Sequence, residues 1–186
     1  MSRFTVTDLP IAGVRLVERQ RLGDSRGFLS RLFCAEELAT AGWVKPIAQI
    51  NHTYTARQGT VRGMHFQRPP YGEMKLVICL SGQVWDVVVD VRAGSPTFLH
   101  WHAEILSADN CRALLISEGV AHGFQALTDD VELLYLHSEP FVPAAEAGLC
   151  PNDLRLDIAW PLAITELSAR DAGHRLIDAA FEGVKI

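Results

Sequence analysis

The sequence predicts an all-β fold in a single domain, and two observations carry this prediction. The chain has 186 residues, about the length of one domain, and 48% of them are hydrophobic, which is enough for a sizeable core. Between residues 46 and 137, short apolar runs alternate with turn residues such as Ser81-Gly82 and Ala93-Gly94-Ser95-Pro96. Many short strands at this spacing are typical of a β-sandwich or β-barrel. We therefore expect one domain over residues 1–186, with a barrel core over about 46–137.

The expected elements follow in chain order. The N-terminal part is expected to hold one short helix, Ala35–Ala41, which ends at Gly42. Val84–Val91 reads VWDVVVDV and is nearly continuous in apolar residues, as expected of a strand covered on both faces. The apolar runs that we expect to be strands are Lys75–Leu80, Val84–Val91, Phe98–Leu106, Arg112–Ile116 and Glu132–Leu136.

The last part of the chain is expected to cap the barrel. Its composition changes after Pro140, and its Trp160-Pro161 turn and sparse polarity indicate that residues 140–186 pack onto the barrel instead of forming a second domain. Ser168 is a residue type that commonly begins helices, so we expect a short C-terminal helix with Ala172–Ala180 as its body.

Charge, hydropathy and cysteine usage exclude several classes of protein. The net charge is −5 and there is no Lys/Arg run, so nucleic acid is not an expected partner. No apolar run approaches the roughly 18 residues of a membrane span, and the first ten residues lack an apolar signal core. The four cysteines are far apart and form no CxxC pair, so neither a structural zinc site nor a disulfide framework is expected. We expect a cytoplasmic protein without a membrane partner.

The segment Gly59–Lys75, GTVRGMHFQRPPYGEMK, is the most informative for chemistry. His65 lies in a probable strand, with the cations Arg62 before it and Lys75 after it. A histidine is the side chain most readily poised as a general base near neutral pH. The spacing alone also allows a purely structural histidine.

Three further residues are candidates, each with a plainer alternative. His122 lies between Gly119 and Gly123, which indicates close approach of another group or a simple turn with a solvated histidine. Tyr135 is either a core aromatic or a proton donor. Asp171 either complements a helix dipole or orients a distant histidine.

A metal or organic cofactor is not expected. His100 and His102 form an HxH pair, but metal-binding cupins combine HxH with a Glu and a further His, and the segment His65-Phe66-Gln67 lacks the second histidine. His100 and His102 are instead expected on a solvated or interface face. The sequence contains no GxGxxG, P-loop or GxSxG motif, so nothing calls for a nicotinamide cofactor or a nucleophilic serine.

A series of motifs spans most of the chain, from Asp24 to Asp171. In their order and spacing, they resemble those of the dTDP-4-dehydrorhamnose 3,5-epimerases of deoxysugar biosynthesis. The motifs are Asp24-Ser25-Arg26-Gly27-Phe28, Gln49-Ile50-Asn51, Val61-Arg62-Gly63-Met64-His65-Phe66-Gln67, Lys75-Leu76-Val77, Asp86–Arg92, Ser95-Pro96-Thr97-Phe98, Glu118–Phe124, Asp157–Pro161 and Asp171.

The resemblance implies a cupin-type jelly-roll β-barrel that works as a homodimer without metal or cofactor. It also implies a substrate class, a nucleotide-linked 4-keto-6-deoxyhexose, most simply dTDP-4-dehydro-6-deoxy-D-glucose on the route to dTDP-4-dehydro-L-rhamnose. The hydrogens at C3 and C5, next to the ketone, would be removed and returned on the opposite face.

The resemblance also assigns roles to four residues. His65 would be the base, and Asp171 would hold its imidazole in the right tautomer. Lys75 would lie near the oxygen of the enolate, whose stabilisation makes the neighbouring protons labile. Tyr135 would return a proton from the other face.

Binding residues carry over in the same way. Arg170 replaces a lysine that is common at its position and could serve the same anion. Arg31 stands where the family has a Glu that contacts the base, and Phe141 stands where many members have a Tyr, so these two leave the base and the number of inverted centres open. The positions that contact the nucleotide, its phosphates or the sugar in the family are here Arg26, Gln49, Asn51, Arg62, His122 and Glu146.

Two other functions stay open at this point. One is a single-centre epimerase, acting at C3 or C5 of another nucleotide deoxysugar. The other is a non-catalytic cupin that binds a sugar nucleotide. Exchange of substrate hydrogens with heavy water separates all three readings.

Overall fold

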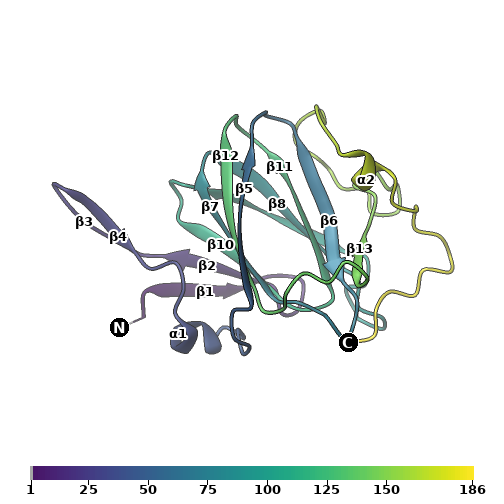
Figure 1. Cartoon of the computed structure of the whole chain (residues 1–186), viewed down its shortest axis with the longest axis horizontal. Coiled ribbons are helices and arrows are strands. Elements are labelled where there is room, and N and C mark those ends of the chain that lie inside the picture. The colour runs from purple at the N-terminus through teal and green to yellow at the C-terminus, as the bar shows by residue number, and fades with distance from the viewer. Residues whose placement is uncertain (1) are drawn as a thin grey trace.

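Two β-sheets packed face to face make up most of the protein (Figure 1). This computed structural model describes residues 2–186. The six-stranded sheet has the order β1-β2-β10-β7-β12-β5, and the five-stranded sheet has the order β13-β6-β11-β8-β9. The first sheet contains β1 (Phe4–Asp8), β2 (Arg15–Arg19), β5 (Gln49–Thr55), β7 (Lys75–Ser81), β10 (Arg112–Ile116) and β12 (Val131–His137). The second contains β6 (Val61–Gln67), β8 (Gln83–Asp90), β9 (Trp101–Ser107), β11 (Val120–Ala126) and β13 (Glu146–Gly148).

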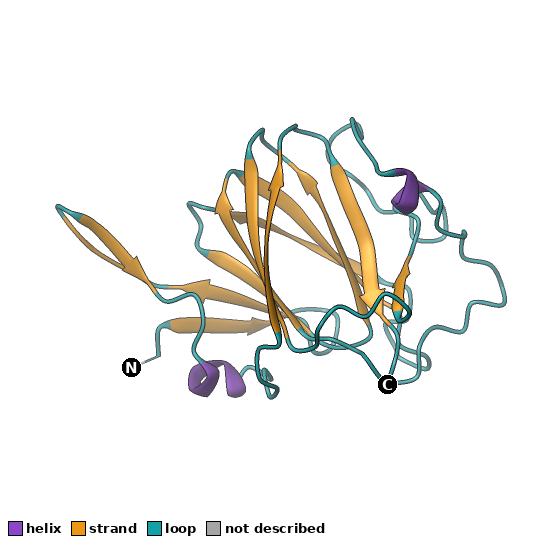
Figure 2. Cartoon of the chain, viewed as in Figure 1, coloured by secondary structure: helices purple, strands orange, loops and turns teal. Residues whose placement is uncertain are grey.

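The all-β jelly-roll expectation is confirmed, and strands dominate the cartoon in Figure 2. Antiparallel pairing runs through both sheets, and alternate side chains point between them. Val77 and Leu133 from the first sheet meet Val88 and Phe124 from the second, each at most 2% exposed. Removing these apolar side chains from water is the main force that holds the two sheets together.

The strand β8 is covered on both faces, as its apolar run predicts. Val84 and Val88 belong to the core between the sheets. Val87 and Val89 point the other way and pack with residues of the C-terminal segment such as Ile158. The segment after residue 140 therefore caps the outer face of the five-stranded sheet, and it supplies the cover that the sequence of β8 requires.

All five expected strands are present, and all but Arg112–Ile116 have shifted ends. The strand expected to begin at Phe98 begins at Trp101, because Leu99 has φ 62° and a left-handed residue ends a strand. The strands β1 and β2 extend the sheet beyond the core expected over 46–137. In β1 only Phe4 is buried, so its sequence carries little apolar alternation.

Both expected helices are shorter than predicted. The first, α1 (Ala35–Ala39), ends two residues early. The second, α2 (Ala169–Ala172), begins at Ser168 as expected, with the Ser168 side chain accepting from the backbone N–H of Asp171. The prediction that its body continues to Ala180 is wrong. The chain leaves the helix at Gly173, and the backbone N–H of Ile177 donates to the Asp153 carboxylate instead of to its own helix.

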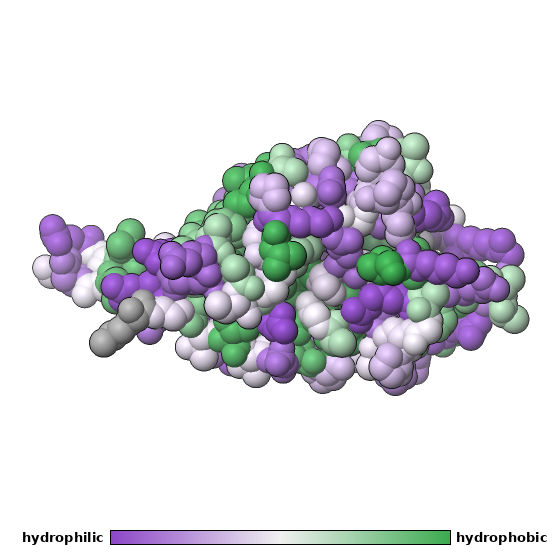
Figure 3. All heavy atoms as spheres, turned by 90° about the horizontal axis from the view of Figure 1, so that it is seen from below, coloured by the Kyte–Doolittle hydropathy of each residue, from purple (hydrophilic) through white to green (hydrophobic). Residues whose placement is uncertain are grey.

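A two-stranded arm projects from the body of the molecule (Figure 1). It consists of β3 (Arg21–Asp24) and β4 (Gly27–Ser30). Leu22, Phe28 and Leu29 on this arm are 43%, 61% and 71% exposed. Figure 3 shows hydrophobic atoms lying among hydrophilic ones at this projecting end.

Two expectations about the chain as a whole can be compared with the structure. Within residues 2–186 no helix is long and apolar enough to cross a membrane. The cysteines are all free, which agrees with the expected lack of a disulfide framework; they are Cys34, Cys79, Cys111 and Cys150.

Candidate active site

One end of the barrel opens into a cavity of about 830 Å³, which we call the main cavity. Its walls come from both sheets and from the C-terminal segment around α2. Eight of the residues predicted from the sequence line it: Asn51, Arg62, His65, Lys75, His122, Tyr135, Arg170 and Asp171.

His65 and Asp171 form a hydrogen-bonded pair in the wall of the main cavity. Nε2 of His65 lies 2.8 Å from Oδ1 of Asp171, whose side chain is only 3% exposed. The cap of α2 by Ser168 fixes the backbone of Asp171, and the backbone N–H of Gly63 donates to its Oδ2 at 3.2 Å. The carboxylate therefore holds the imidazole in place from behind.

The charge state of Asp171 follows from these contacts. Burial opposes its ionisation, but the hydrogen bond and charge of His65, the Gly63 N–H and the Arg170 guanidinium hold its pKa well below the usual range. An ionised Asp171 accepts hydrogen bonds only, so Nε2 of His65 carries the proton that points to it. Nη2 of the half-exposed Arg170 also lies 2.9 Å from this nitrogen, but it cannot donate to a protonated Nε2. The second ring nitrogen, Nδ1, is then the basic one.

Tyr135 faces His65 from the other side of the barrel. Tyr135 belongs to β12 in the six-stranded sheet, whereas His65 belongs to β6 in the five-stranded sheet. Burial, together with the nearby Asp86 carboxylate, raises the pKa of Tyr135 above its usual value. The phenol is therefore a protonated group, able to donate, on the side of the cavity opposite His65.

A second histidine–carboxylate pair lies against Tyr135. Nε2 of His122 is 2.9 Å from both oxygens of Asp86, and the His122 ring meets the Tyr135 ring edge-on at 5.8 Å between centroids. Burial is the largest influence on Asp86 and raises its pKa. Asp86 is not among the site residues predicted from the sequence, although a carboxylate inside the apolar run of β8 is itself a signal of a buried polar partner.

Lys75 brings a buried ammonium to the cavity. It is the first residue of β7, it is 5% exposed, and its Nζ donates to the backbone oxygen of His65 at 3.3 Å. Its carboxylate partner is Glu73, at 3.0 Å. A buried charge needs such partners, because leaving water costs several kcal/mol per ion.

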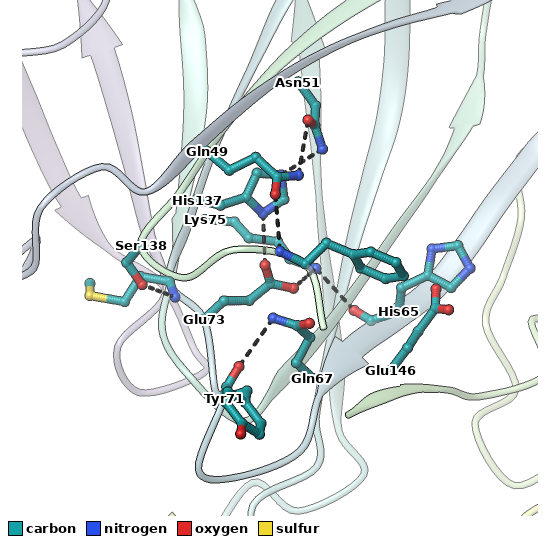
Figure 4. Close-up of polar contacts among 12 residues, drawn as sticks. Gln49, Asn51, His65, Gln67, Tyr71, Glu73, Lys75, His137, Ser138 and Glu146 are labelled. Carbon is teal, nitrogen blue, oxygen red and sulfur yellow. Dashed lines mark hydrogen bonds and ion pairs between the residues drawn. The ribbon is translucent and has the colours of Figure 1, made fainter. Parts of the chain in front are cut away.

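A smaller cavity of about 290 Å³, the side cavity, adjoins the main one, and Figure 4 draws side chains that line it, such as Gln49, Glu73 and Glu146. No element separates the two cavities at this point, because four residues line both of them: Asn51, His65, Lys75 and His137. The other predicted binding residues that line the side cavity are Gln49, Phe141 and Glu146.

Two predicted binding residues do not reach either cavity of their own chain. Arg26 lies at the tip of the projecting arm, where it pairs with Asp24 at 2.6 Å. Arg31 follows the arm and pairs with Glu37. One chain alone therefore does not bring them to the main or the side cavity, because the arm extends away from the barrel.

The HxH pair of the sequence, His100 and His102, lies apart from the main and the side cavity. His102 pairs with Glu104 at 2.9 Å. A different group, His65, Asp171 and His174, offers three ligand atoms within 4.8 Å of one another. Arg170 contacts both His65 and Asp171, and this fixed positive charge opposes a metal cation there.

Besides Asp86, the sequence did not single out two residues that line a cavity, Glu73 and His137, or one neighbour of His65, His174. Glu73 and His137 pair with each other at 2.7 Å, and His174 packs its ring edge-on against that of His65 at 6.3 Å between centroids. Alternation along β12 puts His137 on the face of Tyr135, which is a usable signal for His137. Glu73 and His174 lie outside strands, and no periodic pattern points to them.

Comparison with known proteins identifies the family of this chain. The profile described as dTDP-4-dehydrorhamnose 3,5-epimerase matches residues 8–179. A dTDP-4-dehydrorhamnose 3,5-epimerase of Streptomyces griseus is 42% identical over 165 residues, which cover 88% of this chain and 82% of the relative. A dTDP-4-dehydrorhamnose 3-epimerase of Streptomyces niveus is 40% identical over 173 residues, covering 92% and 83%.

A solved structure agrees with the sequence relatives. The dTDP-6-deoxy-D-glucose-3,5-epimerase of Legionella pneumophila, in complex with dTDP-4-keto-L-rhamnose, has a TM-score of 0.91 and 34% identity to this chain. The match covers 98% of this chain and 99% of that one. Fold, cavity residues and matches over nearly the whole length agree: the chain belongs to the dTDP-4-dehydrorhamnose 3,5-epimerase family.

Proposed function

We propose that this chain is an isomerase that epimerises dTDP-4-dehydro-6-deoxy-D-glucose at C3 and C5 to give dTDP-4-dehydro-L-rhamnose. Family membership supports the substrate class, and the relatives of known name include 3,5-epimerases. The observation that carries the proposal is the arrangement of His65 and Tyr135. They line one cavity from opposite sheets, and inversion needs a base and an acid on opposite faces of the sugar ring.

The first step is removal of a proton next to the ketone. His65 takes the proton from C3 or C5, and the electron pair moves to the C4 oxygen as an enolate. Asp171 stabilises the imidazolium that forms. The Lys75 ammonium stabilises the enolate oxygen, and such a donor in a site that excludes water is commonly the largest single contribution to the rate.

The second step returns a proton on the other face. Tyr135 donates its phenolic proton to the carbanion carbon, and the C4 carbonyl forms again. The phenolate regains a proton and the imidazolium loses one by exchange with solvent, so that the enzyme is restored without a cofactor. Each inverted centre then carries a hydrogen from the solvent.

Substrate binding is assigned to the predicted residues that line the two cavities. Arg62 and Arg170 offer guanidinium groups to a diphosphate, whose oxygens match the planar fork of arginine. Gln49, Phe141 and Glu146 surround the side cavity, which adjoins the main one and offers room for the nucleoside. In this assignment Asn51 and His122 contact the sugar.

We also propose that the chain works as a homodimer in the cytoplasm. The arm exposes Leu22, Phe28 and Leu29, which is an unfavourable arrangement for an isolated chain in water. Packing of the arm on a second copy would cover these side chains. It would also carry Arg26 toward the partner's cavity, which accounts for a predicted binding residue that lies far from its own cavity.

The experiment that tests the proposed function is proton NMR of dTDP-4-dehydro-6-deoxy-D-glucose with this protein in heavy water. We expect deuterium to enter at both C3 and C5 as the L-rhamno product accumulates. Deuterium at a single centre would replace the proposal with a single-centre epimerase, the function named for the Streptomyces niveus relative. Binding without any exchange would replace it with a non-catalytic sugar-nucleotide protein.

A further inference from the structure

A carboxylate that the mechanism above does not use lies directly behind Lys75. Glu73 Oε1 is 3.0 Å from Nζ of Lys75, and Glu73 Oε2 is 2.7 Å from Nδ1 of His137 (Figure 4). All three side chains are nearly out of water, at 9%, 7% and 12% exposure. The register of the strands brings them together, because His137 of β12 pairs with Lys75 of β7.

The direction of each hydrogen bond in this cluster can be assigned. Burial disfavours the charge of Glu73, but the hydrogen bond from His137 and the charge of Lys75 hold its pKa below the usual value. An ionised Glu73 can only accept, so Nδ1 of His137 carries a proton. On the far side of the ring, Nε2 of His137 lies 3.4 Å from Nδ2 of Asn51, an amide nitrogen that can only donate. His137 is therefore neutral, with its single proton on Nδ1.

The same chain of hydrogen bonds continues to the side cavity. Gln49 Nε2 donates to Asn51 Oδ1 at 3.0 Å, and the backbone N–H of Phe141 donates to Gln49 Oε1 at 3.0 Å. Every link has a donor on one side and an acceptor on the other. The line runs without interruption from Phe141 through His137 to Glu73, and Figure 4 shows its dashed contacts.

The cluster has a direct consequence for the ammonium of Lys75. An ammonium has three N–H bonds in fixed tetrahedral directions. One points to the backbone oxygen of His65 and a second points to Glu73. With two directions fixed by buried partners, the third is fixed as well, and Lys75 lines the main cavity where the sugar is assigned. The remaining N–H is thereby held ready before a substrate oxygen arrives.

We propose that Glu73 and His137 are positioning residues, which orient the Lys75 ammonium toward the C4 oxygen of the substrate. The proposal rests on the proposed epimerase function and deepens it. His137 draws one oxygen of Glu73 away from Lys75, so that the carboxylate holds the ammonium with its other oxygen and does not cover all three N–H bonds. If Glu73 and His137 only stabilised the fold, the direction of the free N–H of Lys75 would not matter for the rate.

The test compares three variants by steady-state kinetics of solvent exchange into the sugar nucleotide. Glu73→Gln keeps the shape but loses the charge that holds the ammonium, and we expect kcat to fall about 10- to 100-fold with KM within about threefold, as for a displaced catalytic group. His137→Phe should cause a similar loss. His137→Asn can still donate to Glu73, and we expect it to restore most of kcat.

Glu132→Gln is the matched control. Glu132 of β12 pairs with His52 of β5 at 2.9 Å, but this pair is exposed and lines neither cavity. Its variant should keep the wild-type kcat. A Glu73→Gln protein with the kcat of this control, or a loss confined to KM, would overturn the positioning role. If Glu73→Gln does not fold, the contrast between His137→Phe and His137→Asn decides, and equal kcat values would overturn the proposal.

A spectroscopic readout tests the assigned tautomer separately. In the wild-type protein, nitrogen NMR of His137 should show a neutral ring with its proton on Nδ1. A proton on Nε2 alone would overturn the proposal. Failure of the epimerase proposal can be told apart from failure of the positioning role. If the wild-type protein catalyses no hydrogen exchange, the epimerase function itself is ruled out. Normal wild-type exchange together with an unaffected Glu73→Gln removes only the positioning role.

Discussion

Nε2 of His65 and Oδ1 of Asp171 lie 2.8 Å apart, although 106 positions of the sequence separate the two residues. The contact joins strand β6 to the four-residue helix α2, and the helix is held by its Ser168 cap. The C-terminal segment is thus more than a cover for the outer face of the five-stranded sheet. It supplies the carboxylate that fixes the tautomer of the proposed base.

Asp171→Asn tests this relationship. An asparagine keeps the shape but can present an N–H to His65, which favours the wrong tautomer, and we expect kcat to fall by about 100-fold or more. The rate is followed as hydrogen exchange in heavy water. Asp109→Asn, at an exposed turn, is the control and should leave the rate unchanged. Near-normal exchange by Asp171→Asn would mean that the carboxylate does not orient the base.

Lys75→Ala tests the stabilisation of the enolate. Removal of one such donor is expected to lower kcat by about 100- to 1,000-fold while KM changes little, because the interaction strengthens as charge develops on the oxygen. Lys185→Ala, at an exposed position, serves as the control. A higher KM at unchanged kcat would identify Lys75 as a binding residue only.

Phe28→Asp tests the proposed homodimer. Phe28 is 61% exposed on the arm, and a carboxylate there would be buried at great cost if the arm packs on a second copy. We expect the wild-type protein to sediment as a dimer and the variant as a monomer. Leu154→Asp changes a leucine that is 89% exposed outside the arm, and it should stay dimeric. A monomeric wild-type protein would rule out the homodimer.

Asp90→Asn tests how stability depends on pH. Hydrogen bonds from Arg92, Ser95 and Thr97 outweigh the effect of burial and hold the pKa of Asp90 at about 2, below its usual 3.8. A lowered carboxyl pKa contributes stability that is complete above the unfolded value and is lost as the pH falls through the folded value. Asp90→Asn should therefore lower the free energy of unfolding by on the order of 2 kcal/mol at pH 7. The difference from wild type should shrink between pH 4 and pH 2 in urea unfolding curves, and a constant difference would contradict this assignment.

The strands that could be predicted from sequence are those in which buried positions give a continuous or alternating apolar pattern. Val84–Val91 is the clearest case, because the core between the sheets and the C-terminal cap need apolar residues on both its faces. Strand β1 could not be predicted, because only Phe4 is buried in it. The body of the C-terminal helix was wrongly predicted, because the segment forms its hydrogen bonds and apolar contacts with other parts of the chain, such as Asp153.

The sequence allowed prediction of the main chemical groups of the cavity, but not of all the contacts among them. The motif residues His65, Lys75, Tyr135 and Asp171 could be singled out, and the structure brings all four to one cavity. The pairing of Glu73 with His137 could not be anticipated, because it depends on the register between β7 and β12, which no local pattern encodes.

The most direct test of the central claim, that base and acid act from opposite faces, is the Tyr135→Phe variant in heavy water. We expect His65 still to remove protons in this variant, so that deuterium continues to enter the substrate while formation of the inverted product falls much further. Exchange and inversion lost to the same extent would contradict the assignment of Tyr135 as the acid, and inversion at the wild-type rate would contradict it as well.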